Sequence, residues 1–128
     1  MKYLLDTHAA IWALEGNRTK LSDAASALLE DASVSLYVSI ASAWEIAIKV
    51  SIGKLNFAGG SVAFLEEMRL NGVELLEITS SHIEIVEALP PIHRDPFDRI
   101  LVATAKADGL AILTADENIH KYDVTHVW

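Results

Sequence analysis

Short apolar runs alternate with segments of helical periodicity along the chain. Runs rich in aliphatic and β-branched side chains predict buried strands, and apolar positions that recur about every three or four residues predict helices. The predicted strands are residues 3–5, 36–39, 73–78, 110–114 and 124–128. The predicted helices are residues 7–15, 24–31, 40–52, 61–71, 80–89 and 96–107. Gly16, Gly72, Gly109 and the Pro90-Pro91 pair supply breaks between these elements.

The alternation of strands and helices indicates the fold class. Successive parallel strands need a helical crossover, and because these crossovers are right-handed, helices come to cover both faces of the sheet. The pattern therefore predicts a three-layer α/β/α fold with a parallel sheet. A chain of 128 residues has the usual size of one domain, so we expect residues 1–128 to form a single domain without repeats.

Composition narrows the class of protein further. Hydrophobic residues make up 52% of the chain and charged residues 22%, which is enough apolar surface for a globular core. No apolar run approaches the roughly 20 residues of a membrane-spanning helix, and the first residues lack the apolar region of a signal peptide. We therefore expect a soluble, cytoplasmic protein without a membrane partner.

Charge and cysteine content limit the chemistry. Because the chain has no cysteine, it has no disulfide and no thiolate metal site, so any bound metal must be held by oxygen or imidazole. A formal net charge of −8 argues against a surface that coats nucleic acid, since such surfaces neutralise phosphates with clustered lysine and arginine. The same acidity, with the high apolar content, suits a chain that pairs with copies of itself or with a basic partner.

Two aspartates follow predicted strands. Asp6 comes directly after the strand at 3–5, and Asp116 follows the strand at 110–114. Ligands of open parallel sheets gather outside the carboxyl ends of the strands, so both carboxylates face one crevice if these two strands are neighbours. Aspartate is also a preferred helix N-cap, and each residue taken alone could serve only to cap the helix after it.

The segment from Asp95 to Arg99 opens a helix. An aspartate followed by proline, with a second acid three residues on, is close to the ideal start of a helix, and we expect Asp95 to be its cap. Asp98 is then left at the helix start, facing the same crevice as the other acids. Arg99 beside it is expected to form a structural ion pair.

Glu45 is the most informative single position. Apolar residues surround the helix at 40–52 almost completely, and Glu45 and Lys49 are its only charges. Their spacing of four residues allows an ordinary helical ion pair. A carboxylate in so apolar a helix is costly unless a cation or a metal neutralises it, which favours a functional site.

The acids taken together are stronger evidence for a functional site than any one of them alone. Converging carboxylates repel one another unless a cation joins them, and sites built from oxygen ligands select magnesium or manganese. We therefore expect Mg²⁺ or Mn²⁺ to be held by acids from four separate segments, namely Asp6, Glu45, Asp98 and Asp116. The histidines show no helical pairing with another ligand and are expected in surface or structural roles; they are His8, His82, His93, His120 and His126.

Four stretches of the sequence resemble the PIN-domain ribonucleases, in particular the VapC-type toxins of bacterial toxin–antitoxin pairs. They are Leu4-Leu5-Asp6-Thr7-His8; Ser42 to Lys49 followed by Gly53-Lys54-Leu55; His93-Arg94-Asp95-Pro96-Phe97-Asp98-Arg99; and Leu113-Thr114-Ala115-Asp116. The resemblance runs from end to end. It implies a five-stranded parallel sheet in the order 3-2-1-4-5.

The resemblance also implies roles for individual residues. The four acids already singled out match the metal-binding positions of the family. Residues expected to support them are Thr7, Asp95, Arg99 and Thr114. Basic residues expected to contact RNA are Lys49, Lys54 and Arg94.

The expected function is that of a metal-dependent endoribonuclease, the toxin of a toxin–antitoxin pair, which hydrolyses RNA with a metal-activated water. The expected partners are RNA, a cognate antitoxin and a second copy of the chain. The alternative is a non-enzymatic, metal-binding regulatory or signalling α/β module. A phosphoacceptor module would need an aspartate after the third strand, where Ile78 is followed by Thr79, and an inactive relative of a nuclease would have no need of four intact acids. Trp12 and Trp44 are expected in the core or in an interface.

Overall fold

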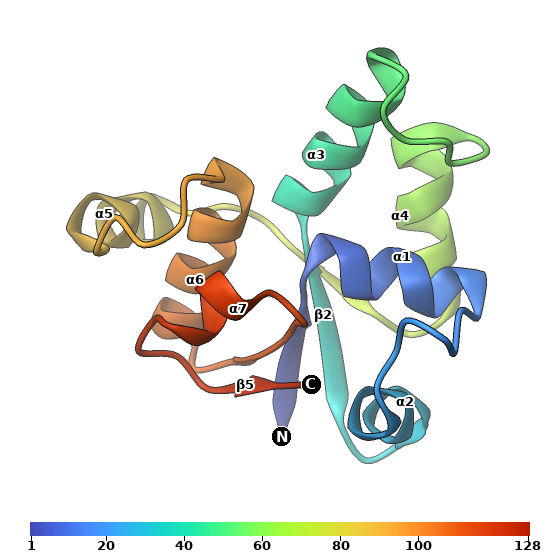
Figure 1. The fold of residues 1–128 in the computed structure, drawn as a ribbon, viewed down its shortest axis with the longest axis horizontal. Coiled ribbons are helices and arrows are strands. Elements are labelled where there is room, and N and C mark those ends of the chain that lie inside the picture. Colours follow the sequence, from blue (N-terminus) through green and yellow to red (C-terminus); the bar gives the residue numbers. More distant parts are fainter.

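The computed structural model describes residues 1–128, and its strands form a five-stranded sheet (Figure 1). The strands are β1 (Lys2–Leu5), β2 (Ser35–Ser39), β3 (Glu74–Leu76), β4 (Ala111–Leu113) and β5 (His126–Val127). The helices are α1 (Thr7–Glu15), α2 (Asp23–Glu30), α3 (Ile40–Ser51), α4 (Gly60–Leu70), α5 (Ser80–Ala88), α6 (Pro96–Asp108) and α7 (Glu117–His120).

Every pair of neighbouring strands is parallel, and the order across the sheet is β3-β2-β1-β4-β5. The predicted fold class and strand order are confirmed. β1 lies at the centre, where Leu5 pairs with Val38 of β2 on one side and with Leu113 of β4 on the other. The carboxyl ends of these three strands therefore meet at one edge of the sheet, where sites of open α/β folds form.

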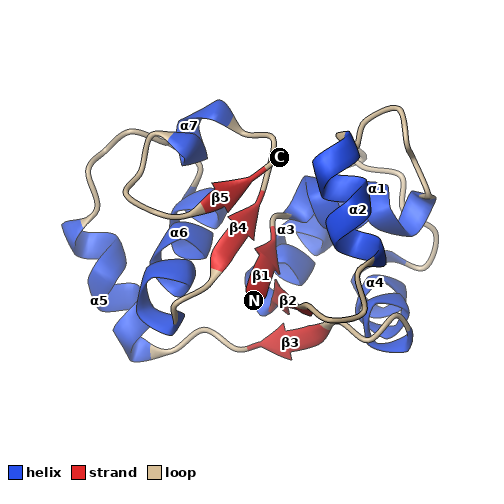
Figure 2. Cartoon of the chain, turned by 90° about the horizontal axis from the view of Figure 1, so that it is seen from below, coloured by secondary structure: helices blue, strands red, loops and turns tan.

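Helices cover both faces of the sheet, α1 to α4 on one face and α5 to α7 on the other (Figure 2). The central strands are apolar at successive positions because side chains of a strand alternate between faces. Leu5 belongs to the core beneath α1 to α4, and Leu4 belongs to the core beneath α5 to α7. Leu113 and Ile112 repeat this division on β4. The two cores give the predicted three layers.

The connections at the carboxyl edge are very short. Asp6 is the only residue between β1 and α1, and α3 begins directly after β2, with Ser39 as its N-cap. A residue at such a junction lies at the sheet edge and at a helix N-terminus at the same time. The two predicted uses of an acid after a strand, as cap and as site residue, are therefore compatible.

The predicted boundaries differ from the observed ones by no more than two residues. The element that the sequence pattern missed is α7, a helix of only four residues that is too short to show periodicity. Trp44 does not belong to the core, because it is 61% exposed and contacts Phe97 edge-on. Trp12 packs at the margin of the core. None of the helices has the length and the apolar character needed to cross a lipid bilayer.

Two isoleucines of the α3 region allow a matched test of the packing. Ile46 is fully buried, whereas Ile52, just after the helix, is 58% exposed. Ile46→Ala should lower the free energy of unfolding by about 2–5 kcal/mol, because it leaves a cavity in the core, and Ile52→Ala should change it by less than about 0.5 kcal/mol. Urea unfolding followed by circular dichroism measures both. Equal effects of the two substitutions would contradict the described burial of α3.

Candidate metal centre

Asp6 is 4% exposed and uses both of its carboxylate oxygens within the protein. Its Oδ1 accepts a hydrogen bond of 2.7 Å from the backbone N–H of Ala9, which caps α1, and its Oδ2 accepts one from the hydroxyl of Thr114. Burial raises the pKa of Asp6, although both hydrogen bonds oppose the shift. A buried carboxyl group with a raised pKa thus lies at the end of the central strand.

Asp116 lies after β4 and caps α7. Its Oδ1 accepts a hydrogen bond of 2.8 Å from the backbone N–H of Asn118, and its own backbone N–H donates to the hydroxyl oxygen of Thr114 at 3.0 Å. The fully buried Thr114 therefore joins Asp6 to Asp116 through one hydroxyl group. Burial raises the pKa of Asp116, but the hydrogen bond with His93 and those from the backbone outweigh burial, so the pKa lies below its ordinary value.

Glu45 is 2% exposed on α3, and both of its oxygens are also engaged. Lys49 Nζ lies 2.6 Å from Oε2, and the hydroxyl of Thr7 donates to Oε1 at 2.7 Å. The Oγ of Ser42 lies 2.9 Å from the same threonine oxygen. The hydrogen bond to Glu45 raises the pKa of Lys49. The predicted ion pair exists, and Thr7, the residue after Asp6, also ties α3 to the end of β1.

Asp98 lies in the first turn of α6, which Asp95 caps by accepting a 2.8 Å hydrogen bond from the backbone N–H of Phe97. Burial raises the pKa of Asp98 to about 8. Neighbouring negative charges add to this effect, in the decreasing order Asp95, Asp6, Glu45 and Asp116. The structure therefore brings the four predicted acids into electrostatic contact, with Asp98 receiving the repulsion of the others.

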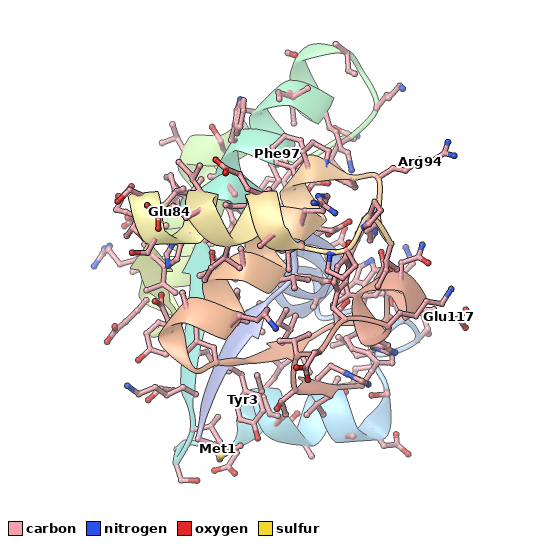
Figure 3. The ribbon with its side chains drawn as sticks, turned by 90° about the vertical axis from the view of Figure 1, so that its left-hand side faces the viewer. Met1, Tyr3, Glu84, Arg94, Phe97 and Glu117 are labelled. Carbon is pink, nitrogen blue, oxygen red and sulfur yellow. The ribbon has the colours of Figure 1, made fainter.

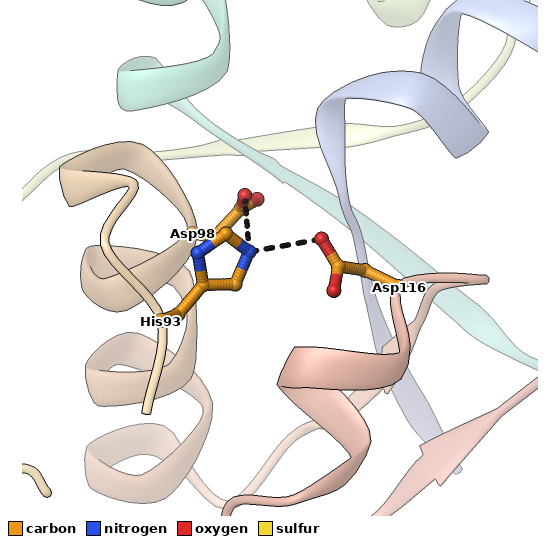
Figure 4. Close-up of side chains that lie close together, drawn as sticks. All are labelled: His93, Asp98 and Asp116. Carbon is orange, nitrogen blue, oxygen red and sulfur yellow. Dashed lines mark hydrogen bonds and ion pairs between the residues drawn. The ribbon is translucent and has the colours of Figure 1, made fainter. Parts of the chain in front are cut away.

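The imidazole of His93 lies between two of these acids (Figure 4). Its Nε2 is 3.1 Å from Oδ2 of Asp98 and 2.9 Å from Oδ2 of Asp116, and its Nδ1 accepts a 3.1 Å hydrogen bond from the backbone N–H of Asp95. Ligand atoms of His93, Asp98 and Asp116 lie within 4.8 Å of one another. The sequence predicts a surface or structural role for His93 and does not predict that its ring lies within the acidic cluster.

The position of His93 depends on a loop rather than on helical spacing, and this explains why the sequence reading missed it. The residue precedes α6, where the chain leaves α5 through Pro90-Pro91. Its backbone N–H donates to the hydroxyl of Tyr122 at 2.9 Å, which holds the loop against the chain after α7. The sequence did contain one indication of this contact. His93 lies two residues before Asp95, the N-cap of α6, and a side chain at that position can reach the first turn of the helix.

The other histidines that make hydrogen bonds within the fold agree with the expected structural role. His82 is 2% exposed, accepts at Nδ1 from the backbone N–H of Thr79 and lies 3.1 Å from Asp108 through Nε2. His120 Nε2 lies 2.8 Å from the carbonyl oxygen of Thr114. These contacts stabilise α5 and the segment around β4.

Arg99 does not form the expected ion pair. Its guanidinium group donates to the carbonyl oxygens of Val86 and Pro90, at 3.1 and 3.0 Å, and to the hydroxyl of Tyr122 at 3.1 Å. The planar fork of an arginine can satisfy several acceptors at once. The prediction is wrong because the end of α5 and its following loop present carbonyl oxygens to this side chain, which therefore fixes α5 and the loop against α6.

The predicted RNA-contacting cations occupy different positions. Lys49 is bonded to an acid of the cluster, whereas Lys54 and Arg94 are exposed and form no ion pair. Figure 3 shows the side chain of Arg94 directed away from the protein, on the loop that precedes α6. The acidic cluster therefore has one cation, Lys49, bonded to one of its acids and another, Arg94, on the loop before α6.

The donor set suits a hard divalent cation. Carboxylate oxygens predominate, a mixture that favours magnesium or manganese over softer metals. The donor atoms nearest to one another belong to Asp98, Asp116 and His93, while Asp6 and Glu45 are more deeply buried and have each oxygen hydrogen-bonded. Burial and, after it, the neighbouring negative charges raise the pKa of Asp98, and a cation among these groups would lower it again.

This combination of a parallel α/β/α fold with acids at the carboxyl edge agrees with the comparison with protein families. The family model described as the PIN domain matches residues 3–124, and the chain belongs to the PIN domain family. A comparison with curated proteins found no match.

Solved structures of similar fold come from bacterial toxin–antitoxin complexes. One is a chain of VapBC2 from Rickettsia felis bound to a DNA fragment from its promoter, with a TM-score of 0.72 and 14% sequence identity. This match covers 99% of the present chain and 98% of the VapBC2 chain. A chain of DNA-bound VapBC from Salmonella typhimurium has a TM-score of 0.68 and 15% sequence identity, and the match covers 100% of the present chain and 97% of the VapBC chain. A chain of a toxin–antitoxin complex from Klebsiella pneumoniae has a TM-score of 0.65 and 19% sequence identity, and the match covers 98% of the present chain and 96% of that chain. At these identities the likeness concerns the fold.

The raised pKa of Asp98 predicts a pH dependence of stability in the presence of EDTA. Between the ordinary value of 3.8 and about 8, folded Asp98 keeps a proton that the unfolded chain has released, so the free energy of unfolding should decrease as pH rises. Asp98→Asn removes this contribution, and the variant should gain on the order of 2 kcal/mol over the wild type between pH 5 and pH 8. Urea unfolding at several pH values measures the difference. Asp123→Asn, at an exposed position, is the control. If the free energy of unfolding changed with pH in the same way for the wild type and Asp98→Asn, the prediction would be contradicted.

Proposed function

We propose that this protein is a metal-dependent endoribonuclease that acts as the toxin of a toxin–antitoxin pair. The observation that carries the proposal is the convergence on Asp98 of acids from the junction between β1 and α1, from α3, and from the junction between β4 and α7. Carboxylates from distant segments that meet at the carboxyl edge of a parallel sheet have no structural need of one another, and ligands of such folds gather at this edge. Membership of the PIN domain family supports a nuclease.

Asp98 and Asp116 would hold Mg²⁺ or Mn²⁺, with Asp6 and Glu45 supplying further negative charge. When bound, the ion stabilises charge on a phosphate and lowers the pKa of a water molecule so that it becomes a nucleophile near neutral pH. The contribution of Thr7 is to fix the carboxylate of Glu45, and Thr114 does the same for Asp6. Hydrolysis would break the bond between phosphorus and the 3′ oxygen, leaving a 5′ phosphate and a 3′ hydroxyl.

RNA has to approach a protein of net charge −8. A metal ion and a few local cations would compensate for this charge at the site. Lys49 lies at the margin of the cluster with its side chain 36% exposed, and Arg94 projects from the loop before α6. Lys54 lies farther along the chain, in the turn after α3. We propose that these three residues contact the RNA backbone, and that binding depends on the metal.

The proposed protein partner is an antitoxin. The relatives described above were solved as VapBC or toxin–antitoxin complexes, two of them bound to DNA. An acidic chain suits a partner with a basic segment. Co-expression of such a partner should suppress the growth arrest that this chain causes alone.

We also propose that the protein forms a homodimer. Trp44 and Ile48 lie four residues apart on α3 and are 61% and 37% exposed, so they form a short apolar stripe on the helix surface. A stripe of this kind is unusual for a surface that faces water only.

The second candidate is a metal-binding regulatory module without enzymatic activity. It shares the acidic cluster and the expected metal but would leave RNA intact. The two functions differ in one measurement, which is whether metal-loaded protein cuts RNA.

Asp98→Asn should abolish RNA cleavage and growth arrest, because it removes a negative ligand while keeping the shape of the side chain. Inducible expression of the wild type and the variant, followed by mapping of 5′-phosphate RNA ends, measures both effects. In calorimetry, the variant should bind Mn²⁺ at least about tenfold more weakly than the wild type.

Asp123→Asn, at an exposed position after α7, serves as the control and should cleave like the wild type. New RNA ends that persist in Asp98→Asn would reject the proposed site. Mn²⁺ uptake without any new RNA ends in the wild type would instead favour the regulatory module.

If the protein forms a homodimer through this stripe, a charged substitution in the stripe should halve its mass in solution. Trp44→Glu should convert a dimer of the wild type into a monomer, because an uncompensated charge in an apolar interface is costly. Light scattering after size exclusion measures the mass. Val62→Glu, at a 78% exposed position on α4, is the matched control and should remain dimeric. A monomeric wild type at all concentrations would refute the homodimer.

A further inference from the structure

His93 makes hydrogen bonds at its backbone N–H and at both ring nitrogens. Its backbone N–H donates to Tyr122, its Nδ1 accepts from the backbone N–H of Asp95, and its Nε2 lies within hydrogen-bond distance of Asp98 and Asp116. Only 13% of the side chain is exposed. The ring is thus held at a fixed place and orientation between two carboxylates.

The contact with Asp95 determines which nitrogen carries a proton. A backbone N–H can only donate, so Nδ1 must offer its lone pair to Asp95. A neutral imidazole then has its hydrogen on Nε2, the nitrogen that faces Asp98 and Asp116. A metal ligand needs a lone pair on the coordinating nitrogen, and the tautomer selected by Asp95 offers a donor there instead.

The same two carboxylate oxygens would serve a cation. Oδ1 of Asp116 accepts hydrogen bonds from the backbone of α7, which leaves Oδ2 as the oxygen free for an ion, and Oδ2 is the atom that faces His93. In Asp98, the oxygen that faces His93 is also Oδ2 (Figure 4). The Nε2–H group and a metal ion that uses these oxygens would occupy the same space.

Resting on the metal site of the proposed function, we infer that His93 is a positioning residue whose Nε2–H competes with the divalent ion for Asp98 and Asp116. The imidazole makes its Nε2 hydrogen bond with Oδ2 of Asp116 and keeps Oδ2 of Asp98 within 3.1 Å of the same nitrogen, and it is displaced, rather than recruited, when the ion binds. Removing the donor leaves Oδ2 of Asp98 and Oδ2 of Asp116 without this neighbour in the metal-free protein. Metal binding should therefore become tighter when the donor is lost, whereas loss of a true ligand would weaken it.

Two variants of the full chain separate the two nitrogens. In His93→Asn, the side-chain carbonyl can accept from Asp95 in place of Nδ1, but no group reaches the place of Nε2. In His93→Gln, the longer side chain brings an amide N–H close to the place of Nε2. Calorimetric titration with Mn²⁺ should give about tenfold tighter binding for His93→Asn, corresponding to one lost hydrogen bond to a charged group, and nearly unchanged binding for His93→Gln. His126→Asn, at an exposed histidine of β5, is the matched control and should bind as the wild type does.

Two spectroscopic measurements on the wild type test the same inference without a variant. Nitrogen NMR of the imidazole in EDTA should find the hydrogen of His93 on Nε2. Pulsed EPR of the Mn²⁺-loaded protein should find no directly coordinated nitrogen. Weaker Mn²⁺ binding by His93→Asn, a hydrogen on Nδ1, or a coordinated nitrogen would each overturn the role of His93 and leave the proposed nuclease standing. Absence of Mn²⁺ uptake by the wild type would overturn the metal site and this inference together.

Discussion

Repulsion among carboxylates at the carboxyl edge of the sheet is the constraint to which the rest of this structure responds. The strand order places the ends of β1 and β4 side by side, so Asp6 and Asp116 are neighbours although more than a hundred residues separate them in the sequence. Burial then strengthens the repulsion, because charges interact more strongly away from water. The pKa of Asp98 shows both effects, because burial raises it most and the neighbouring acids raise it further.

The fold and the edge of the sheet that carries the acids followed from local signals in the sequence. Leu4 and Leu5 belong to opposite cores, and an apolar run of this kind indicates a strand covered on both faces. The parallel arrangement followed from helices between the strands, while the strand order came from the resemblance to a family. Asp6 and Asp116 were predicted at the same edge because the position of a residue after a parallel strand fixes its place in the fold.

The details that the sequence reading missed depend on side chains that meet through the fold. The alternative roles considered for each acid turned out to coexist, since Asp6 caps α1 and also belongs to the cluster, and Glu45 has both its ion pair and its acidic neighbours. The contacts of His93 and Arg99 were not predicted because their partners come from loops and from carbonyl groups, which no periodicity reveals. Which acids contact a metal stays a prediction, as does the single domain.

The helix termini explain why the protein tolerates these acids. Asp6 and Asp116 are the N-caps of α1 and α7, and Asp98 lies in the first turn of α6, so each of these carboxylates sits at a helix N-terminus. Free backbone N–H groups and the helix dipole stabilise a negative charge there, typically by about 0.3–1 kcal/mol. Glu45 is different, because it lies in the middle of α3, where no free N–H group is available. It is also the acid of the cluster that has a lysine within 2.6 Å. Asp6, Asp116 and Glu45 therefore each have a compensating group within their own segment. Asp98 instead shares its helix start with the negative charge of Asp95, which adds to the effect of burial in raising its pKa.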